Sequence, residues 1–197
     1  MSQIANAQQY DPESDFTAEP VDNGSAVKIT GYVGSSKVTS IPPQINNLPV
    51  TIIGAGAFDR KQITSVAIPT SVTLIEIGSF ANNQLTSVTI PNSVVSIEGS
   101  AFGNNPQLTS VTIPNSVTFI GMMAFFNCSL ASITIPHSVI SIGVRAFFNN
   151  PLSRITIGSN VTFESILGNF PFGFDVFYQS NGSKAGTYTL DDGWRID

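Results

Sequence analysis

Two glutamates, Glu76 and Glu98, come closest in this sequence to the spacing of a catalytic carboxylate pair. Each follows an isoleucine at the same place in a repeated segment, and they lie 22 residues apart. If successive segments stack about 4.8 Å apart, the two carboxylates approach the roughly 5–5.5 Å separation found in a retaining glycosidase. No aromatic residue accompanies them to line a sugar cleft. We therefore expect two solvated glutamates that point apart and no hydrolase activity.

The sequence contains one histidine and one cysteine as further candidates for reactive side chains. His137 is the one histidine and stands where other segments carry Thr70, Asn92 and Asn115, so a solvated turn is expected there. Cys128 is the one cysteine, which excludes an intramolecular disulfide, and we expect it to be buried where a coil closes. The repeats contain no zinc-ligand cluster and no aspartate column of the calcium-binding type. We predict no catalytic residue, no metal and no cofactor.

The elements that carry these side chains recur with a fixed period. The decapeptide LTSVTIPNSV occurs at 85–94 and again at 108–117. Ile-Pro pairs recur at 41–42, 68–69, 90–91, 113–114 and 135–136, with Ile157-Gly158 as an altered sixth copy. A phenylalanine follows each pair, at Phe58, Phe80, Phe102, Phe125 and Phe147. Spacings of 22, 22, 23 and 22 residues predict one unit stacked as a solenoid.

Within a unit, apolar residues alternate around Val88 and Ile90, as in a strand with one buried face. Pro91 lacks an N–H and ends that strand, so stacked prolines turn each coil at one place. The phenylalanines are predicted to form one buried column. We also expect one column of asparagines to satisfy backbone groups in the closing turn. These are Asn82, Asn104, Asn127 and Asn149.

The segment LTSVTIPNSVVSIEGSAFGNNPQL resembles the BspA-like, or treponemal-type, leucine-rich repeat, whose unit reads approximately LTSVTIPxSVTSIGxxAFxxCxxL. The resemblance covers about residues 37–160. It implies a mostly β fold, a leucine-rich-repeat solenoid of five 22–23-residue coils with N- and C-terminal caps. We expect a flexible acidic leader at 1–24, an N-terminal cap and first repeat at 25–63, repeats at 64–160 and a C-terminal cap with a β-hairpin at 161–197.

The residues that flank the inward position of each strand are predicted to face outward together. Their candidate binding members, which we call the strand face, are Ser65, Ser87, Thr89, Ser110, Thr112, Ser132, Thr134 and Arg154. Three explanations remain open: solubility with strand propensity, adhesion to a macromolecule, and ice binding by a regular hydroxyl array. Ala67 and Arg154 interrupt the array, which disfavours ice binding.

The later units also gain large apolar side chains, which we call the apolar patch: Met122, Met123, Phe126, Val144 and Phe148. Such a cluster is typical of an association site, so it is a candidate homo-oligomer interface. The phenylalanines of the segment 169–178 are expected to cover the open end of the core instead. We do not expect this cap to reach the fourth coil, which carries Phe126.

Charge and hydropathy restrict the classes of partner. Charged residues make up 11% of the chain against about 25% in a usual protein. The net charge of −5 without a basic stripe disfavours nucleic acid and anionic membranes as partners. No run of 18 apolar residues is present, so no membrane span is predicted.

These observations favour a non-enzymatic protein-binding module over an enzyme. The resemblance implies a bacterial surface adhesin-like protein that binds host or cell-surface macromolecules, including extracellular-matrix proteins. The alternative is a self-assembling structural protein that forms a homo-oligomer through the apolar patch. The resemblance also implies a cell-surface or secreted location, although the printed sequence contains no secretory signal.

Overall fold

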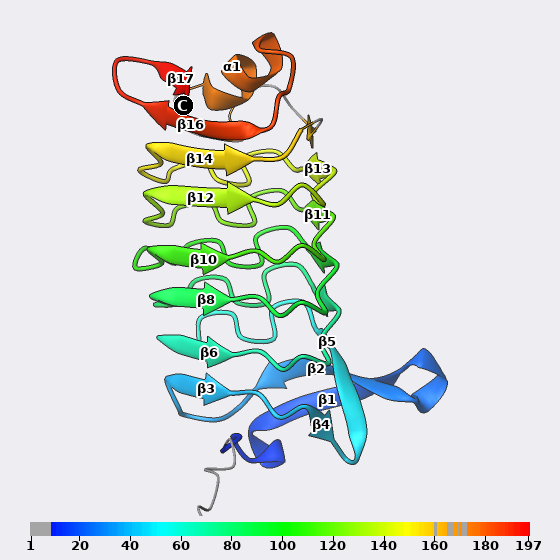
Figure 1. Ribbon diagram of the computed structural model, residues 1–197. Helices are drawn as coiled ribbons and strands as arrows, with labels where there is room; N and C mark the ends of the chain where they lie inside the picture. Colours follow the sequence, from blue (N-terminus) through cyan, green and yellow to red (C-terminus); the bar gives the residue numbers. More distant parts are fainter. Residues whose placement is uncertain (1–8, 160, 165–167, 169, 171–172) are drawn as a thin grey trace, which may run out of the picture.

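Each coil begins with a short strand, because one inward Val or Ile is flanked by hydroxyl residues that accept extended backbone. The computed structural model describes residues 9–159, 161–164, 168, 170 and 173–197. The strands stack in a row along the molecule (Figure 1). This first row consists of β3 (Val38–Ser40), β6 (Ser65–Ala67), β8 (Ser87–Thr89), β10 (Ser110–Thr112), β12 (Ser132–Ile135) and β14 (Arg154–Ile157).

A second row of strands, short except for the first, follows the turn in each coil. It consists of β5 (Leu48–Ile53), β7 (Leu74–Ile75), β9 (Ser96–Ile97), β11 (Phe119–Ile120), β13 (Ser141–Ile142) and β15 (Thr162–Phe163). These strands pair in parallel and in register, so that Ile75, Ile97 and Ile120 are level with one another. The predicted mostly β solenoid with coils of about 22 residues is confirmed.

The proline turns close in the same way in successive coils. The N–H of Val94 donates to the carbonyl of Pro91 at 3.0 Å, and the N–H of Val117 donates to that of Pro114 at 3.1 Å. Because each proline has no N–H to continue the first row, the chain leaves that row there and enters the second.

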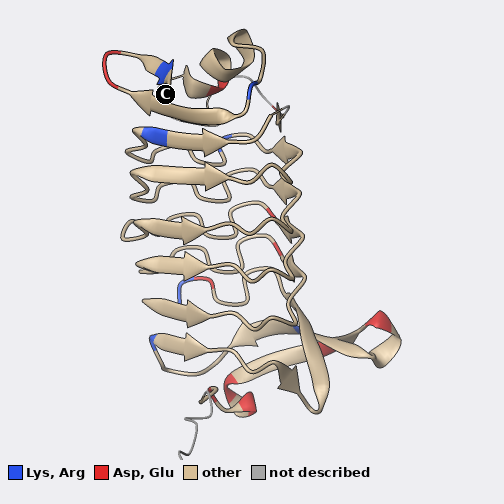
Figure 2. Cartoon of the chain, in the orientation of Figure 1, with Lys and Arg blue, Asp and Glu red and all other residues tan. Residues whose placement is uncertain are grey.

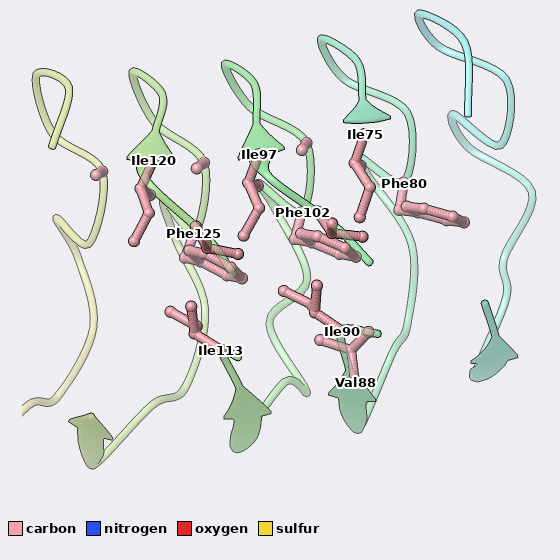
Figure 3. Close-up of a cluster of buried hydrophobic side chains, with 14 of the residues drawn as sticks. Ile75, Phe80, Val88, Ile90, Ile97, Phe102, Ile113, Ile120 and Phe125 are labelled. Atoms are coloured by element: carbon pink, nitrogen blue, oxygen red, sulfur yellow. The ribbon is translucent and has the colours of Figure 1, made fainter. Parts of the chain in front are cut away.

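A column of stacked phenylalanines fills the interior (Figure 3). Phe80, Phe102, Phe125 and Phe147 are fully buried, as predicted. Ring centroids from Phe58 to Phe147 are 4.9, 5.3, 5.4 and 5.3 Å apart in sequence. The Phe column continues to Tyr32 at one end, 5.4 Å from Phe58, and to Phe170 at the other, 4.9 Å from Phe147. Its two ends are therefore aromatic surfaces that the caps must cover.

The C-terminal segment covers one end of this column. It contains the helix α1 (Phe174–Ser180) and an antiparallel hairpin of β16 (Gly186–Leu190) and β17 (Trp194–Ile196). Phe174 is fully buried, with its ring 5.0 Å from that of Phe170 and 4.9 Å from that of Trp194. Phe177 is partly buried against the core, and Phe172 lies outside the described residues.

The N-terminal segment covers the other end, so the predicted flexible leader at 1–24 is wrong for residues 13–24. The elements there and in the first repeat are η1 (Glu13–Asp15), β1 (Phe16–Val21), η2 (Asp22–Gly24), β2 (Ala26–Tyr32) and β4 (Gln44–Ile45). β1 pairs antiparallel with β2, and the ring of Phe16 lies 5.4 Å from that of Tyr32. The acidic composition of this segment led to the prediction of a flexible leader, but its one phenylalanine is needed to close the core.

The asparagines that bind the backbone lie one position later than predicted. Asn105 is buried, and its Oδ1 accepts the N–H of Leu85 at 3.2 Å. Its Nδ2 donates to the carbonyls of Phe80 and Phe102 at 3.1 and 2.9 Å. Asn83 and Asn150 make the equivalent bonds in their coils. One amide thus joins two coils beside the Phe column.

The asparagine column predicted from the sequence has a different role. Asn82, Asn104, Asn127 and Asn149 have positive φ, between 55° and 59°, a backbone region that asparagine tolerates better than most residues. Their side chains turn outward. Asn127 donates to Asn104 Oδ1 at 3.1 Å, and Asn149 donates to Asn127 Oδ1 at 2.6 Å. The prediction that these four side chains satisfy the backbone is therefore wrong.

The substitution Phe102→Ala should lower the free energy of unfolding by about 3–5 kcal/mol, because it opens a cavity in the closely packed Phe column. Phe148→Ala is the matched control, since that ring is 40% exposed and lies outside the column. Urea denaturation followed by circular dichroism measures both. Similar midpoints for the two variants would contradict the packing described here.

The substitution Asn105→Ala should lower the free energy of unfolding by at least about 2 kcal/mol, because it leaves several buried backbone groups unpaired. Asn104→Ala, one residue earlier, removes an amide that bonds to another side chain, and should have a much smaller effect. The same denaturation experiment compares them. A larger loss for Asn104→Ala would reverse the assignment of the two columns.

Candidate functional site

The strand face is exposed and nearly uncharged, as its alternation predicts. All eight candidate residues, from Ser65 to Arg154, are solvent-exposed, and the valine or isoleucine between them points inward. Figure 2 shows charge gathered toward the ends of the molecule and little of it on the first row of strands. The rigid coils therefore present hydroxyl groups at regular intervals, which suits hydrogen bonding to a neutral partner better than electrostatic attraction.

The strand face extends beyond the repeats onto the C-terminal hairpin. β16 pairs antiparallel with β14, which places Thr187 beside Thr156 with their hydroxyls 2.9 Å apart. Arg154 lies opposite Thr189 and forms an ion pair with Asp197 at 3.4 Å. Sequence reasoning missed Thr187 and Thr189, although the alternation in GTYTL is the signal that would have found them. Arg154 thus has an ion-pair partner next to the hairpin, and its side chain remains 57% exposed.

The first row is interrupted twice, which the repeat pattern did not show. Pairing joins β3 to β6, β8 to β10, and β12 to β14 and the hairpin, but the described chain has no ladder between β6 and β8 or between β10 and β12. A cleft lies at each interruption. The one between β6 and β8 has a volume of about 410 Å³ and the one between β10 and β12 about 270 Å³. Residues of the strand face line both clefts.

Glu76 and Glu98 are half-buried, and each is held by a partner in the protein. Glu76 Oε2 accepts the N–H of Ala55 at 2.9 Å, and Glu98 Oε1 accepts the hydroxyl of Ser96 at 2.5 Å. They are less solvated than expected. The cavity beside them, about 270 Å³, is completed by Ala55, Leu74 and Ile77, none of them aromatic. Glu76 thus binds the backbone of the preceding coil and Glu98 a side chain of its own coil. The cavity lacks the aromatic lining of a sugar site.

Cys128 is buried, as predicted, and replaces the coil-joining asparagine in one unit. Burial raises the pKa of its thiol to about 12. A thiol with so high a pKa is not a nucleophile at neutral pH. The one histidine, His137, is exposed at its turn, as expected. In the described part of the chain, no three His, Cys, Asp or Glu side chains gather as metal ligands.

The cysteine is tolerated because its coil follows the one 23-residue unit. In other coils an asparagine at this position accepts a backbone N–H from the preceding coil. Here that N–H belongs to Leu108, and it already donates to the carbonyl of Asn105 at 2.9 Å. The extra residue between Asn105 and Leu108 makes this turn possible, so the amide is not required.

The apolar patch is partly exposed. Met122 and Phe148 are 51% and 40% exposed, and the rings of Phe126 and Phe148 stack with centroids 6.3 Å apart. Gly168 of the C-terminal segment lies near Phe148, in the coil after the one that carries Phe126. A Cβ built on Gly168 would lie 3.9 Å from Cδ2 of the Phe148 ring. Met122 and Phe126 remain accessible beside this contact.

The family of the chain follows from its repeats. The model of the BspA-type leucine-rich repeat region matches residues 51–169 in six copies, which is more than half of the chain. The chain belongs to the BspA-type leucine-rich repeat family. The resemblance seen in the sequence is thereby confirmed, and one more copy is matched than the five coils predicted.

Two solved structures share the fold of this BspA-type protein. The Treponema pallidum leucine-rich repeat protein superposes with a TM-score of 0.66 and 23% identity, over 88% of this chain and 95% of that one. A leucine-rich repeat protein from Bacteroides ovatus superposes with a TM-score of 0.64 and 29% identity, over 76% of this chain but 41% of that one. A search of curated proteins found no match. Among the described residues, no helix has the length and apolar character needed to cross a membrane.

Proposed function

We propose that this BspA-type protein is a non-enzymatic protein-binding module whose binding surface is the strand face. The observation that carries the proposal is the exposure, in one row, of uncharged hydroxyl side chains on a rigid stack of coils. Repeat proteins of this shape present extended surfaces to macromolecules. Leucine-rich repeat proteins are also generally non-enzymatic, and Glu76, Glu98 and Cys128 all have structural partners here.

The partner class follows from the surface and the family. A neutral, hydroxyl-rich face has little to offer nucleic acid or an anionic membrane, which need clustered Lys and Arg. It suits a protein partner that also offers uncharged donors and acceptors. The family resemblance points to host-matrix and cell-surface proteins, and hence to a surface or secreted location. We propose an adhesin-like role on this basis.

The test is capture of extracellular-matrix proteins by the wild-type chain and by the triple variant Ser87→Lys, Ser110→Lys and Ser132→Lys. Capture should fall at least tenfold, because three long charged side chains then stand on the strand face. Asn92→Lys, Asn115→Lys and His137→Lys together form the matched control, with the same charge added at exposed turns. This control should bind as the wild type does, with an unchanged circular dichroism spectrum.

The wild-type interaction should also depend weakly on salt, since the strand face has few charges for salt to screen. Equal loss of capture in both lysine variants, or no capture by the wild type, would contradict the proposal. A strong salt dependence would instead indicate binding through the acidic ends of the molecule.

A second candidate, self-association through the apolar patch, is favoured by strained backbone beneath it. Gly56 and Gly78 have positive φ at one position of their coils. Ser100, and then the larger Met123 and Arg145, occupy the same position with φ of 55°, 57° and 58°. A side chain in this region costs roughly 1–2 kcal/mol relative to ordinary helical backbone. Retaining large side chains there is consistent with a surface role.

If the patch joins two copies, Phe126→Ser with Phe148→Ser should convert an oligomer to a monomer in sedimentation velocity. Val95→Ser with Ile140→Ser is the matched control, since both are exposed apolar residues away from the patch, 48% and 64% exposed. Met122→Asp tests the same surface while leaving Phe126 and Phe148 in place. A wild-type chain that is monomeric at high concentration would contradict this second candidate.

A further inference from the structure

β10 and β12 face one another across a cleft rather than pairing. The β10–β12 cleft is lined by Thr109–Ile113 and Ser132–Thr134 and has a volume of about 270 Å³. Cα atoms of the two strands still approach within 8 Å. An inserted strand would need about 9–10 Å between its neighbours, which is twice the usual strand spacing. The cleft is therefore narrower than another strand would need.

One wall of the cleft is the backbone of Val111. The carbonyl of Thr112 accepts the N–H of Ile90 at 3.2 Å, so the polar groups of Thr112 point toward β8. Backbone direction alternates along a strand, so the N–H and C=O of Val111 point toward β12. Val111 is also half-buried, whereas Val88 at the same place in the preceding coil is 3% exposed. The cleft thus opens beside Val111.

The other wall is the backbone of Ser132 and Thr134. The carbonyls of Ala131 and Ile135 accept N–H groups of Ser153 and Gly158, which directs them, and Ile133 between them, toward β14. By the same alternation, Ser132 and Thr134 direct their N–H and C=O groups toward β10. In an intact ladder Val111 would donate to Ser132 and accept from Thr134. That ladder is missing in the described chain.

A group that satisfies both walls must offer a donor and an acceptor in one plane. A carboxamide does so, and this protein already uses it between coils. Asn105 accepts an N–H of one coil and donates to carbonyls of two coils through the same side chain. The geometry of an amide therefore matches the spacing of the backbone groups that stacked coils present to one another.

The absence of charge in the lining of the cleft favours a neutral ligand group. The residues that line the β10–β12 cleft are all uncharged. A carboxylate or ammonium entering it would lose hydration without an opposite charge to compensate. The β6–β8 cleft has a more apolar lining, with Ala67, Ile68 and Pro91 among its residues, and is less suited to a polar group.

We propose that the β10–β12 cleft binds the carboxamide side chain of an asparagine or glutamine from a protein that lies on the strand face, a proposal that rests on the function proposed above. The amide pairs with Val111 on one side and with Ser132 and Thr134 on the other. It makes hydrogen bonds to backbone groups that the interrupted row leaves unpaired.

The test uses propionamide as the probe and propionate, its charged counterpart, as the control ligand, each at tens of millimolar. The backbone amide signals of Val111 and Thr134 in the ¹⁵N-labelled full chain should shift saturably with propionamide and not with propionate. The signal of Val88, which lies in the paired strand β8, should not move. Shifts of equal size with both ligands, or none at Val111 and Thr134, would overturn the proposal.

A pair of proline variants tests the walls directly. Thr134→Pro removes an N–H that points into the cleft and leaves the ladder of β12 with β14 in place, so it should abolish the propionamide response at Val111. Thr89→Pro removes the equivalent N–H facing the β6–β8 cleft and should preserve that response. Equal loss in both variants would count against the assignment. If Thr134→Pro fails to fold, the wild-type titration still decides.

The outcomes separate this inference from the proposed function. Capture of matrix protein that is sensitive to the lysine variants, without any propionamide response, keeps the proposed function and overturns the amide site. A propionamide response in a chain that captures no protein supports the amide site and contradicts the proposed function.

Discussion

The stacking of one phenylalanine per coil is the constraint on which the rest of this structure depends. Centroid separations of 4.9–5.4 Å match the spacing at which neighbouring strands exchange hydrogen bonds, so the same translation packs the rings and pairs the backbone. A coil that departed from this rise would open a cavity in the core, which is costly. The caps follow from it as well. Phe16 and Phe174 belong to different kinds of segment, but each covers an exposed ring at one end of the same column.

The outer parts of the coils vary more from unit to unit than the Phe column does. The 23-residue unit adds one residue beside Asn105 without moving the rings of Phe102 and Phe125 apart. Its turn satisfies the N–H of Leu108 internally, and Cys128 then replaces an asparagine without leaving that N–H unpaired. The first row of strands is also interrupted directly after this unit, between β10 and β12. The second interruption, between β6 and β8, has no inserted residue beside it, and nothing in the sequence explains it.

The function proposed for this molecule belongs to surfaces, because many of the repeated side chains hold the coils together. Glu76, Glu98 and Cys128 illustrate this, since each is engaged by the backbone or side chains of its own or a neighbouring coil. The side chains proposed to meet a partner are the hydroxyls of the strand face and those of the apolar patch. The first is regular and neutral, whereas the second is irregular and retains strained residues such as Met123.

Sequence alone determined the period, the proline turns and the buried Phe column, because each depends on local alternation or on a side chain repeated at fixed spacing. Only the tertiary structure decided which of two adjacent asparagines faces inward. Asn104 and Asn105 are identical in type, and the positive φ of the first directs it outward and its neighbour into the core. The position of Phe16 in the core could not be predicted from the sequence either, since an isolated aromatic residue in an acidic segment is not part of a repeat. The interruptions of the first row depend on hydrogen bonds between coils. The strands of the identical decapeptides at 85–94 and 108–117 pair with each other and are each unpaired on the opposite side, because their neighbouring coils differ.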